Sequence, residues 1–324
     1  MDERHVPVWD GRRDAWRAGV GTALRLARAE LTLLRRPRAR YDAVIVGYPG
    51  QVDVPAARRA ARGAPVVFNP LVSLSDTLVA DRGRFSDDSL PARTLRLIDR
   101  AALRAADVVV ADTDANARFL AQLAGLEHVE TCFVGAEDDV FEPTARPAAF
   151  THALFVGKLI PLHGIETILA AARVAPKLPF RLVGSGQLEE LLEERPPNVD
   201  WVPWVEYDEL RDELGHAAAA LGVFGTSSKA ARVIPNKAFQ ALACGTPLVT
   251  ADTPAARELL TDGQDALLVP PGDATALANA LRRLATDDGL RERIGSAGLG
   301  TYRARASEEV LGRRWRDIIE RASA

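Results

Sequence analysis

Residues 153–174 read ALFVGKLIPLHGIETILAAARV, and this stretch decides the fold class. It opens with a short apolar run at 153–156, passes through a glycine turn, and continues into a helix-forming run that starts near Ile165. A strand, a tight turn and a helix in this order form the repeating unit of a parallel sheet covered by helices. The stretch therefore predicts a doubly wound α/β fold.

The same alternation continues on both sides of this stretch. In the first half we predict strands near 42–47, 65–68, 107–111 and 130–134, with helices near 54–62, 92–106 and 114–124. In the second half we predict strands near 153–156, 180–183, 199–202, 219–224, 247–250 and 266–269, and closing helices near 274–285 and 307–322. Thr113 and Asp114 follow a strand directly and are candidate helix caps.

A loop-like passage at 135–150 separates the two rounds of alternation. We therefore expect two Rossmann-like doubly wound domains facing each other across a cleft, at residues 1–140 and 141–306. A last helix at 307–324 is expected to pack back on the first domain. This first domain is expected to be reduced, because residues 1–40 offer a polar start and one helix-like segment where a strand and a glycine-rich turn would open a full domain.

Composition excludes several classes of protein. The chain of 324 residues has 47% hydrophobic residues and a net charge of -3, so neither disorder nor a global nucleic-acid signature is indicated. Its two cysteines, Cys132 and Cys244, are far apart and form neither a disulfide framework nor a zinc cluster pattern. With no membrane-length apolar run and no signal-peptide pattern, we expect a cytoplasmic protein. Homo-oligomerisation is left open.

The opening segment is strongly basic. Apolar residues are interleaved with nine arginines between residues 12 and 40, which predicts a basic amphipathic helix. The arginines are Arg12, Arg13, Arg17, Arg25, Arg28, Arg35, Arg36, Arg38 and Arg40, and the apolar residues are Trp16, Val20, Leu24, Leu31 and Leu34. Such a helix packs on its own domain with a solvated charged face, or it rests on the anionic inner face of a membrane. The sequence leaves both alternatives open.

An anion site is predicted where acidic residues are missing. No Asp or Glu occurs between Glu213 and Asp252, and Lys229, Arg232 and Lys237 are the only charges there. The segment from Pro235 to the glycine after Cys244 has the proline start and glycine end of a helix. A lysine in the first turn opposes the helix dipole unless an anion binds there, and a diphosphate would resolve the conflict.

Two glycine turns support this site. Gly157, Lys158 and His163 lie between one predicted strand and its helix, and Gly184-Ser185-Gly186 follows the next strand. In a parallel sheet these turns share the carboxyl edge, where doubly wound folds bind ligands. Only four of the 41 basic residues are lysines, and three of them, Lys158, Lys229 and Lys237, fall in these motifs.

Taken in order, these motifs resemble the second half of retaining GT-B glycosyltransferases of the family-four type. The resemblance runs from about Thr131 to the end of the chain and includes the linker Val134-Gly135-Ala136-Glu137, the run 241–247 and the run 262–273. Weaker likeness in the first half rests on 47–50 and 73–77. The resemblance implies a soluble enzyme of polysaccharide or glycan biosynthesis that uses a nucleotide sugar such as UDP- or GDP-sugar.

The resemblance also implies roles for individual residues. It implies catalytic roles for Lys158, Lys237 and Arg232. It implies that the diphosphate is bound by Gly157, Lys158, His163, Pro235, Asn236 and Lys237. It implies that the nucleoside is bound by Gly184, Ser185, Gly186, Trp204 and Gln240, and that the acceptor is contacted by Asn69, Ser73 and Asp76. Arg232 and Gln240 stand where the family has two glutamates, and Asn69 where a histidine is usual. A neutral His163 can still donate a hydrogen bond, or it can become charged beside phosphate, and Arg232 could pair with phosphate beside Lys229 and Lys237.

The implied reaction moves a sugar to an acceptor hydroxyl on a glycan, a lipid-linked substrate or a small molecule, with retention and with neither metal nor cofactor. Fixed positive charge stabilises the departing diphosphate. Nucleic acid is not an expected partner. Two alternatives stay open: a non-catalytic nucleotide-binding homologue that acts as a partner subunit, and a nucleotide-sugar epimerase. A dehydrogenase is disfavoured, because no Gly-x-Gly-x-x-Gly fingerprint opens a helix.

Overall fold

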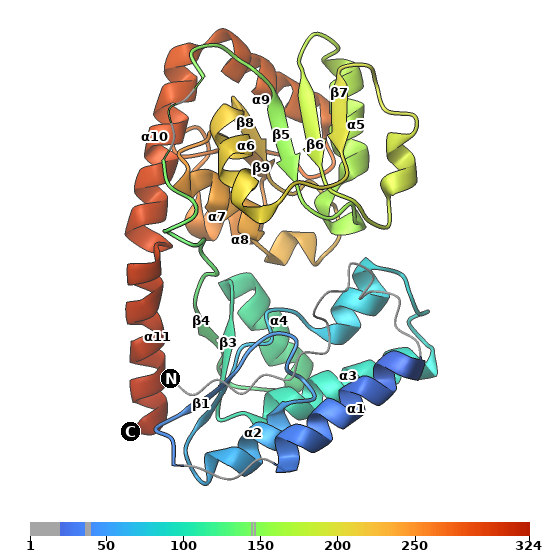
Figure 1. Cartoon of the computed structure of the whole chain (residues 1–324), viewed down its shortest axis with the longest axis vertical. Coiled ribbons are helices and arrows are strands. Elements are labelled where there is room, and N and C mark those ends of the chain that lie inside the picture. The colour runs from blue at the N-terminus through green and yellow to red at the C-terminus, as the bar shows by residue number, and fades with distance from the viewer. Residues whose placement is uncertain (1–19, 36–39, 144, 146) are drawn as a thin grey trace.

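The computed structural model describes residues 20–35, 40–143, 145 and 147–324, which form two lobes (Figure 1). Each lobe is built on one parallel sheet, with strand orders β1-β2-β3-β4 and β10-β9-β8-β5-β6-β7. The first sheet comprises β1 Val44–Val46, β2 Val66–Phe68, β3 Val108–Ala111 and β4 Glu130–Thr131. The second comprises β5 Ala153–Val156, β6 Phe180–Val183, β7 Val199–Val202, β8 Ala219–Leu221, β9 Leu248–Ala251 and β10 Leu267–Val269.

Helices connect the strands in both lobes. The first lobe contains α1 Val20–Arg35, α2 Val54–Ala61, the π-helix η1 Asp76–Asp81, α3 Leu90–Ala105 and α4 Asp114–Ala124. The second contains α5 Ile165–Val174, α6 Leu210–His216, α7 Asn236–Ala243, α8 Pro254–Leu259, α9 Ala274–Thr286 and α10 Asp288–Arg305, and α11 Glu308–Ser323 ends the chain. Short 3₁₀ turns are η2 Pro161–His163, η3 Glu189–Leu192, η4 Tyr207–Glu209 and η5 Ala230–Arg232.

The sequence patterns explain most of these elements. Thr113 caps α4, as predicted, by accepting a hydrogen bond from the backbone N–H of Asn116. Strand β8 is shorter than the predicted run 219–224, because the chain leaves the sheet after Leu221. Pro235 is the N-cap of α7 in an extended conformation, one position before the helix in which it was expected. The long helix α10 was not assigned from the sequence.

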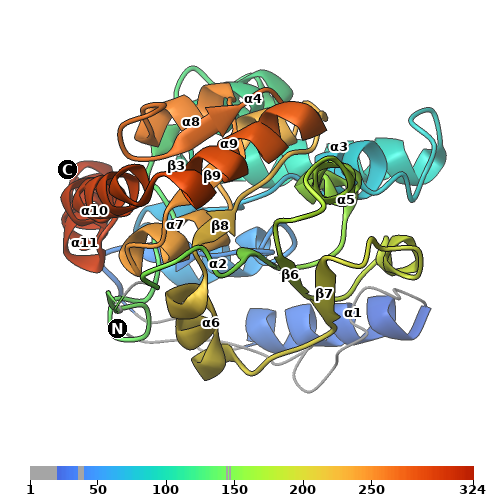
Figure 2. The ribbon, with the colours of Figure 1, turned by 90° about the horizontal axis from the view of Figure 1, so that it is seen from above.

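Both faces of the six-stranded sheet are covered by helices, as Figure 2 shows from above. One core joins the sheet to α5 and α9 and includes Phe155 and Leu281. The other joins it to α7, α8 and α10 and includes Phe239 and Tyr302. This burial on both faces is the reason that strands such as β5, β8 and β10 are continuous apolar runs without alternation.

Helix α11 crosses back to the first lobe and packs beside its sheet (Figure 1). Ile318 is buried against Val67, Val110 and Cys132. Arg314 donates to the carbonyl of Thr131 at 2.9 Å and pairs with Glu130 at 2.7 Å, both in the region of β4. The end of the chain thereby completes the core of the first domain.

Only part of the basic opening segment is described. Trp16 and the arginines at positions 12, 13, 17, 36 and 38 lie outside the described residues. Helix α1 contacts its own domain, since Ala29 is buried and the Arg59 guanidinium donates to the Leu34 carbonyl at 2.7 Å. Leu31 on the same helix is 49% exposed. Within the described ranges, no helix combines the length and the apolar character that crossing a bilayer requires.

Candidate functional site

The two glycine turns at the carboxyl edge of the second sheet are packed backbone to backbone. Gly157 and Gly184 have φ angles of 144° and 142°, which favour glycine. A Cβ atom on Gly184 would lie 1.9 Å from the Gly157 carbonyl oxygen, so no side chain fits there. Leu159 N donates to the Ser185 carbonyl at 3.0 Å and extends the contact. The turn Gly184-Ser185-Gly186 thereby fixes the turn that carries Lys158.

Lys237 points its ammonium at this edge from the first turn of α7. Its Nζ atom is buried and has no hydrogen-bond partner among the described residues. The nitrogen lies 3.6 Å from the centre of the Phe155 ring, and a Cβ atom on Gly157 would lie only 2.8 Å from it. Burial holds the pKa of Lys237 well below its ordinary value. A cation in this position is stable only with an anion beside it.

His163 also lies beside Gly157. Its Cε1 atom would be 3.5 Å from the same Cβ position, so the imidazole and the Lys237 ammonium are neighbours. Burial, and then the charge of Lys237, lower the pKa of His163 well below its usual range. The ring is neutral in this environment and donates its Nδ1–H to the Lys158 carbonyl.

This hydrogen bond corrects the role expected for a neutral His163. The single N–H of a neutral imidazole is already used on the Lys158 carbonyl, so Nε2 is left as an acceptor. A neutral ring therefore has no hydrogen to donate to a phosphate. His163 can bind an anion only after it takes up a proton, which places hydrogens on both nitrogens.

Lys158 follows Gly157 and is exposed. Its pKa is lowered from the ordinary value by partial desolvation and then by the positive charge of Arg82 in the first domain. Gly157, Lys158, His163 and Lys237 are thus brought to one place at the edge of the sheet. The residues predicted to bind a diphosphate are therefore close together. Pro235 and Asn236 belong to the same group, because they directly precede Lys237 at the start of α7.

Arg232 and Lys229 are engaged by the π-helix η1 of the first domain, although the charge of Lys229 still helps to lower the pKa of His163. Arg232 pairs with Asp76 at 2.8 Å and stacks on Phe119, with its guanidinium carbon 4.0 Å from the ring centre. Lys229 is buried and donates to Thr77 Oγ1 at 2.7 Å. The structure therefore differs from the expectation that both side chains surround a phosphate with Lys237. The carboxylate that engages Arg232 comes from the other domain, and for this reason the sequence around 232 did not reveal it.

The residues expected to bind the nucleoside are divided between two regions. Gln240 follows Lys237 by one turn of α7, and its amide hydrogen-bonds the Tyr207 hydroxyl, which donates to Glu137 at 3.0 Å. Trp204 is 56% exposed on the loop after β7, and its indole N–H donates to Glu206 at 3.3 Å.

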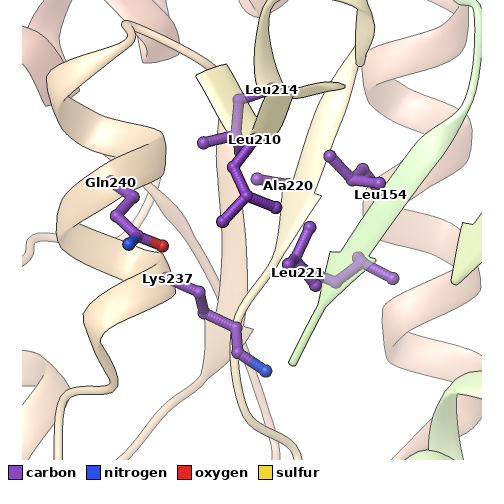
Figure 3. A pocket seen from close by; sticks show the side chains of 8 residues that line it. Leu154, Leu210, Leu214, Ala220, Leu221, Lys237 and Gln240 are labelled. Atoms are coloured by element: carbon purple, nitrogen blue, oxygen red, sulfur yellow. The ribbon is translucent and has the colours of Figure 1, made fainter. Parts of the chain in front are cut away.

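A small cavity adjoins this part of the site (Figure 3). Its volume of about 10 Å³ admits about one water molecule. It is lined by Leu154, Val156, Leu210, Leu214, Ala220, Leu221, Lys237 and Gln240. In Figure 3 the Lys237 side chain extends past Leu221 with its nitrogen directed away from Leu210 and Leu214. The stem of Lys237 thus packs on apolar residues while its charge faces the glycine turn.

The three residues expected on the acceptor side have internal partners. Asn69 accepts a hydrogen bond from Leu71 N at 3.2 Å. Ser73 donates to the buried Asp99 at 2.7 Å, and Asp76 pairs with Arg232. Asp99 was not singled out from the sequence, because an aspartate inside a basic helix gives no local sign that it will hold a distant loop. Acceptor roles for the three residues remain predictions.

Among the residues that the structure describes, no group of three or more His, Cys, Asp and Glu side chains is arranged to hold a metal ion.

The sequence profile of the family "Glycosyl transferases group 1" matches residues 151–287. Residues 151–287 are a glycosyltransferase group 1 domain. The matched region contains every residue that gathers at the Gly157 turn.

Curated relatives extend the likeness to most of the chain. A D-inositol 3-phosphate glycosyltransferase from Nocardioides sp. is 28% identical over 326 aligned positions, which cover 89% of this chain and 69% of the relative. The alignments with this and three further relatives cover between 48% and 69% of their lengths.

Solved structures show the fold. Sucrose-phosphate synthase from Thermosynechococcus elongatus has a TM-score of 0.74 and 21% identity, with coverage of 93% of this chain and 79% of that one. HepE from Anabaena, in complex with UDP, has a TM-score of 0.68 and 19% identity, with coverage of 92% and 82%. The glycosyltransferase fold here is therefore GT-B, with two parallel-sheet domains.

Proposed function

We propose that this glycosyltransferase transfers a sugar from a nucleoside diphosphate sugar to an acceptor hydroxyl. The observation that carries the proposal is the buried Lys237 ammonium, which has no hydrogen-bond partner among the described residues and faces the Gly157 turn beside His163. A diphosphate at this point would supply the missing negative charge. It would also accept hydrogen bonds from the first turn of α7, where backbone N–H groups are unsatisfied.

Positive charge at the site would favour departure of the diphosphate from the sugar. The glycosidic C–O bond breaks, the sugar carbon becomes oxocarbenium-like, and the electron pair stays on the departing diphosphate. Lys158, Lys237 and a protonated His163 stabilise that developing charge from fixed positions. The acceptor oxygen then bonds to the sugar carbon, and its proton passes to an oxygen of the departing diphosphate. We propose that the transfer proceeds with retention and without a metal ion.

The donor nucleotide and the biological context are also part of the proposal. UDP is the first candidate, because HepE, which shares the fold, is described in complex with UDP. Acceptors would be a glycan, a lipid-linked substrate or a small molecule. We place the reaction in the cytoplasm, with peripheral contact to the inner face of the membrane through residues 12–40 as a separate part of the proposal.

A thermal-shift experiment with lysine variants tests the donor site. UDP or GDP at a hundredfold excess over its dissociation constant should stabilise the wild-type protein by about 2.7 kcal/mol. Lys158→Ala and Lys237→Met should lose most of this stabilisation, because each removes a cation from the site. Lys177→Ala is the matched control, since Lys177 is exposed in a turn away from the site.

Two results would count against the proposal. One is a wild-type protein that no nucleoside diphosphate or nucleotide sugar stabilises. The other is equal stabilisation of the wild-type protein and both site variants. Transfer of radiolabelled sugar to an acceptor, measured with and without EDTA, then separates an enzyme from a binding protein and tests independence from metal.

One observation favours a non-catalytic nucleotide-binding protein as the second candidate. Arg232, at a position where the resemblance leads us to expect a glutamate, is engaged by Asp76 and offers no carboxylate to a sugar. Binding of UDP with no transfer and no hydrolysis would support this candidate. Conversion of the donor sugar without any acceptor would instead support a nucleotide-sugar epimerase.

A further inference from the structure

Arg82 follows the π-helix η1 of the first domain and contacts the second domain. Its carbonyl accepts a hydrogen bond from the Gln187 side chain at 3.4 Å. Gln187 comes directly after Gly186, and a Cβ atom on Gly186 would lie 2.7 Å from the Leu159 carbonyl oxygen. The backbone of Arg82 is therefore joined, through one glycine turn, to the turn that carries Lys158.

Asp81 shows that positive charge is in excess at this contact. Its side chain is 1% exposed, and its Oδ2 atom lies 3.4 Å from Arg82 Nε and 3.9 Å from Lys229 Nζ. One carboxylate thus faces two cations, one from each domain. Asp76 and Arg232 add one charge of each sign beside Lys229, so the contact as a whole holds more cations than carboxylates.

The excess charge acts on the donor site. Arg82 is one of the charges that lower the pKa of Lys158 and of His163, together with desolvation in each case. The positive charges of Arg82 and Lys158 therefore repel each other across the two domains, and the charge of Arg82 also opposes protonation of His163. An anion between them would reverse this repulsion.

From these contacts we propose that Arg82 is a ligand of the donor diphosphate that the first domain contributes. Its planar guanidinium would donate to a phosphate oxygen opposite Lys158 and Lys237, in the geometry that arginine offers to phosphate. Donor binding would then require both domains and would hold them together. This inference rests on the proposed function and adds a cross-domain residue to the donor site.

Isothermal titration of UDP into the full chain tests the proposal, with GDP as the probe if the thermal-shift screen selects it. Arg82→Gln should weaken binding by on the order of tenfold, because a charge-assisted hydrogen bond is lost. Arg82→Lys should weaken UDP binding less. Lysine keeps the positive charge, although it lacks the paired N–H donors of the guanidinium. Arg84→Gln, an exposed arginine two positions along the chain, is the control and should bind as the wild type does.

Control measurements separate loss of the proposed phosphate contact from loss of folding. Unfolding of each variant without ligand shows whether it is folded, and Arg82→Lys carries the test if Arg82→Gln is not. Uridine, which lacks phosphate, should bind the wild type and Arg82→Gln equally. If Arg82→Gln binds UDP as tightly as the wild type does, the inference is overturned. This conclusion also holds if the substitution raises the KM for the acceptor. A wild-type protein that binds no nucleoside diphosphate overturns the proposed function itself.

Discussion

At the scale of single residues, the proposed donor site holds two buried basic side chains. Lys237 and His163 both lie beside Gly157, and burial lowers the pKa of both. A bound diphosphate would favour the charged form of each group. Binding should therefore be accompanied by the uptake of protons.

Proton uptake can be measured by titrating UDP at pH 7.5 in buffers of different ionisation enthalpy. We expect net uptake in the wild type, and a reduction by up to about one proton in His163→Asn. His128→Asn is the control, because the His128 side chain is 74% exposed. Affinity should fall as the pH rises through the pKa of the bound His163. Binding without proton uptake would contradict this role.

The free protein should show the opposite trend with pH. Because the folded pKa of His163 lies below 6.5, the unfolded chain binds more protons than the folded chain at mildly acidic pH. His163 therefore contributes a loss of stability as the pH falls below about 6.5. This trend and the tighter binding at low pH come from the same buried imidazole.

At the scale of elements, the start of α4 is capped from the other domain. The Glu258 carboxylate on α8 accepts hydrogen bonds from the backbone N–H groups of Asp114 at 2.7 Å and Ala115 at 2.8 Å. Thr113 adds a second link by donating its hydroxyl hydrogen to the Arg232 carbonyl at 2.5 Å. The dipole of α4 thus favours contact between the two domains.

Glu258→Gln should lower the free energy of unfolding by about 1 kcal/mol, because the helix start loses a charged cap. Urea unfolding measures the change. Glu309→Gln is the comparison, since Glu309 also lies in the first turn of a helix but its side chain is 82% exposed. An equal effect of the two substitutions would show that the contact between the domains contributes nothing.

At the scale of the whole molecule, α11 links the chain terminus to the core of the first domain. Ile318 on this helix is 1% exposed and covers Cys132, and burial raises the pKa of the Cys132 thiol to about 11. Cys244 is buried in the second domain, with its pKa raised to about 12. The two thiols therefore report separately on the two domains.

Ile318→Ala should destabilise the first domain by about 2–4 kcal/mol, because it leaves a cavity under α11. Labelling by a thiol reagent, followed by peptide mass spectrometry, should then become faster at Cys132 and stay slow at Cys244. Equal acceleration at both cysteines would mean that the domains unfold as one unit. No acceleration at Cys132 would mean that α11 does not protect the first domain.

Local sequence determined much of this protein. Strand β7 and helix α4 have the bounds predicted from their patterns, because apolar runs and a capping threonine act over a few residues. The motif around Gly157 and the lysine that follows Asn236 were predicted to share one sheet edge, and the structure brings them together there, since parallel strands bring their ends together.

Only the tertiary structure decided which cations are available to a ligand. Lys229 and Arg232 are as basic in the sequence as Lys237, yet Thr77 and Asp76 of the distant π-helix engage them, while Lys237 has no hydrogen-bond partner among the described residues. The approach of Arg82 to Gln187 is equally non-local, since it joins residues of two different domains. Charge in a sequence is a property of one residue, whereas its neutralisation depends on which distant segment folds against it.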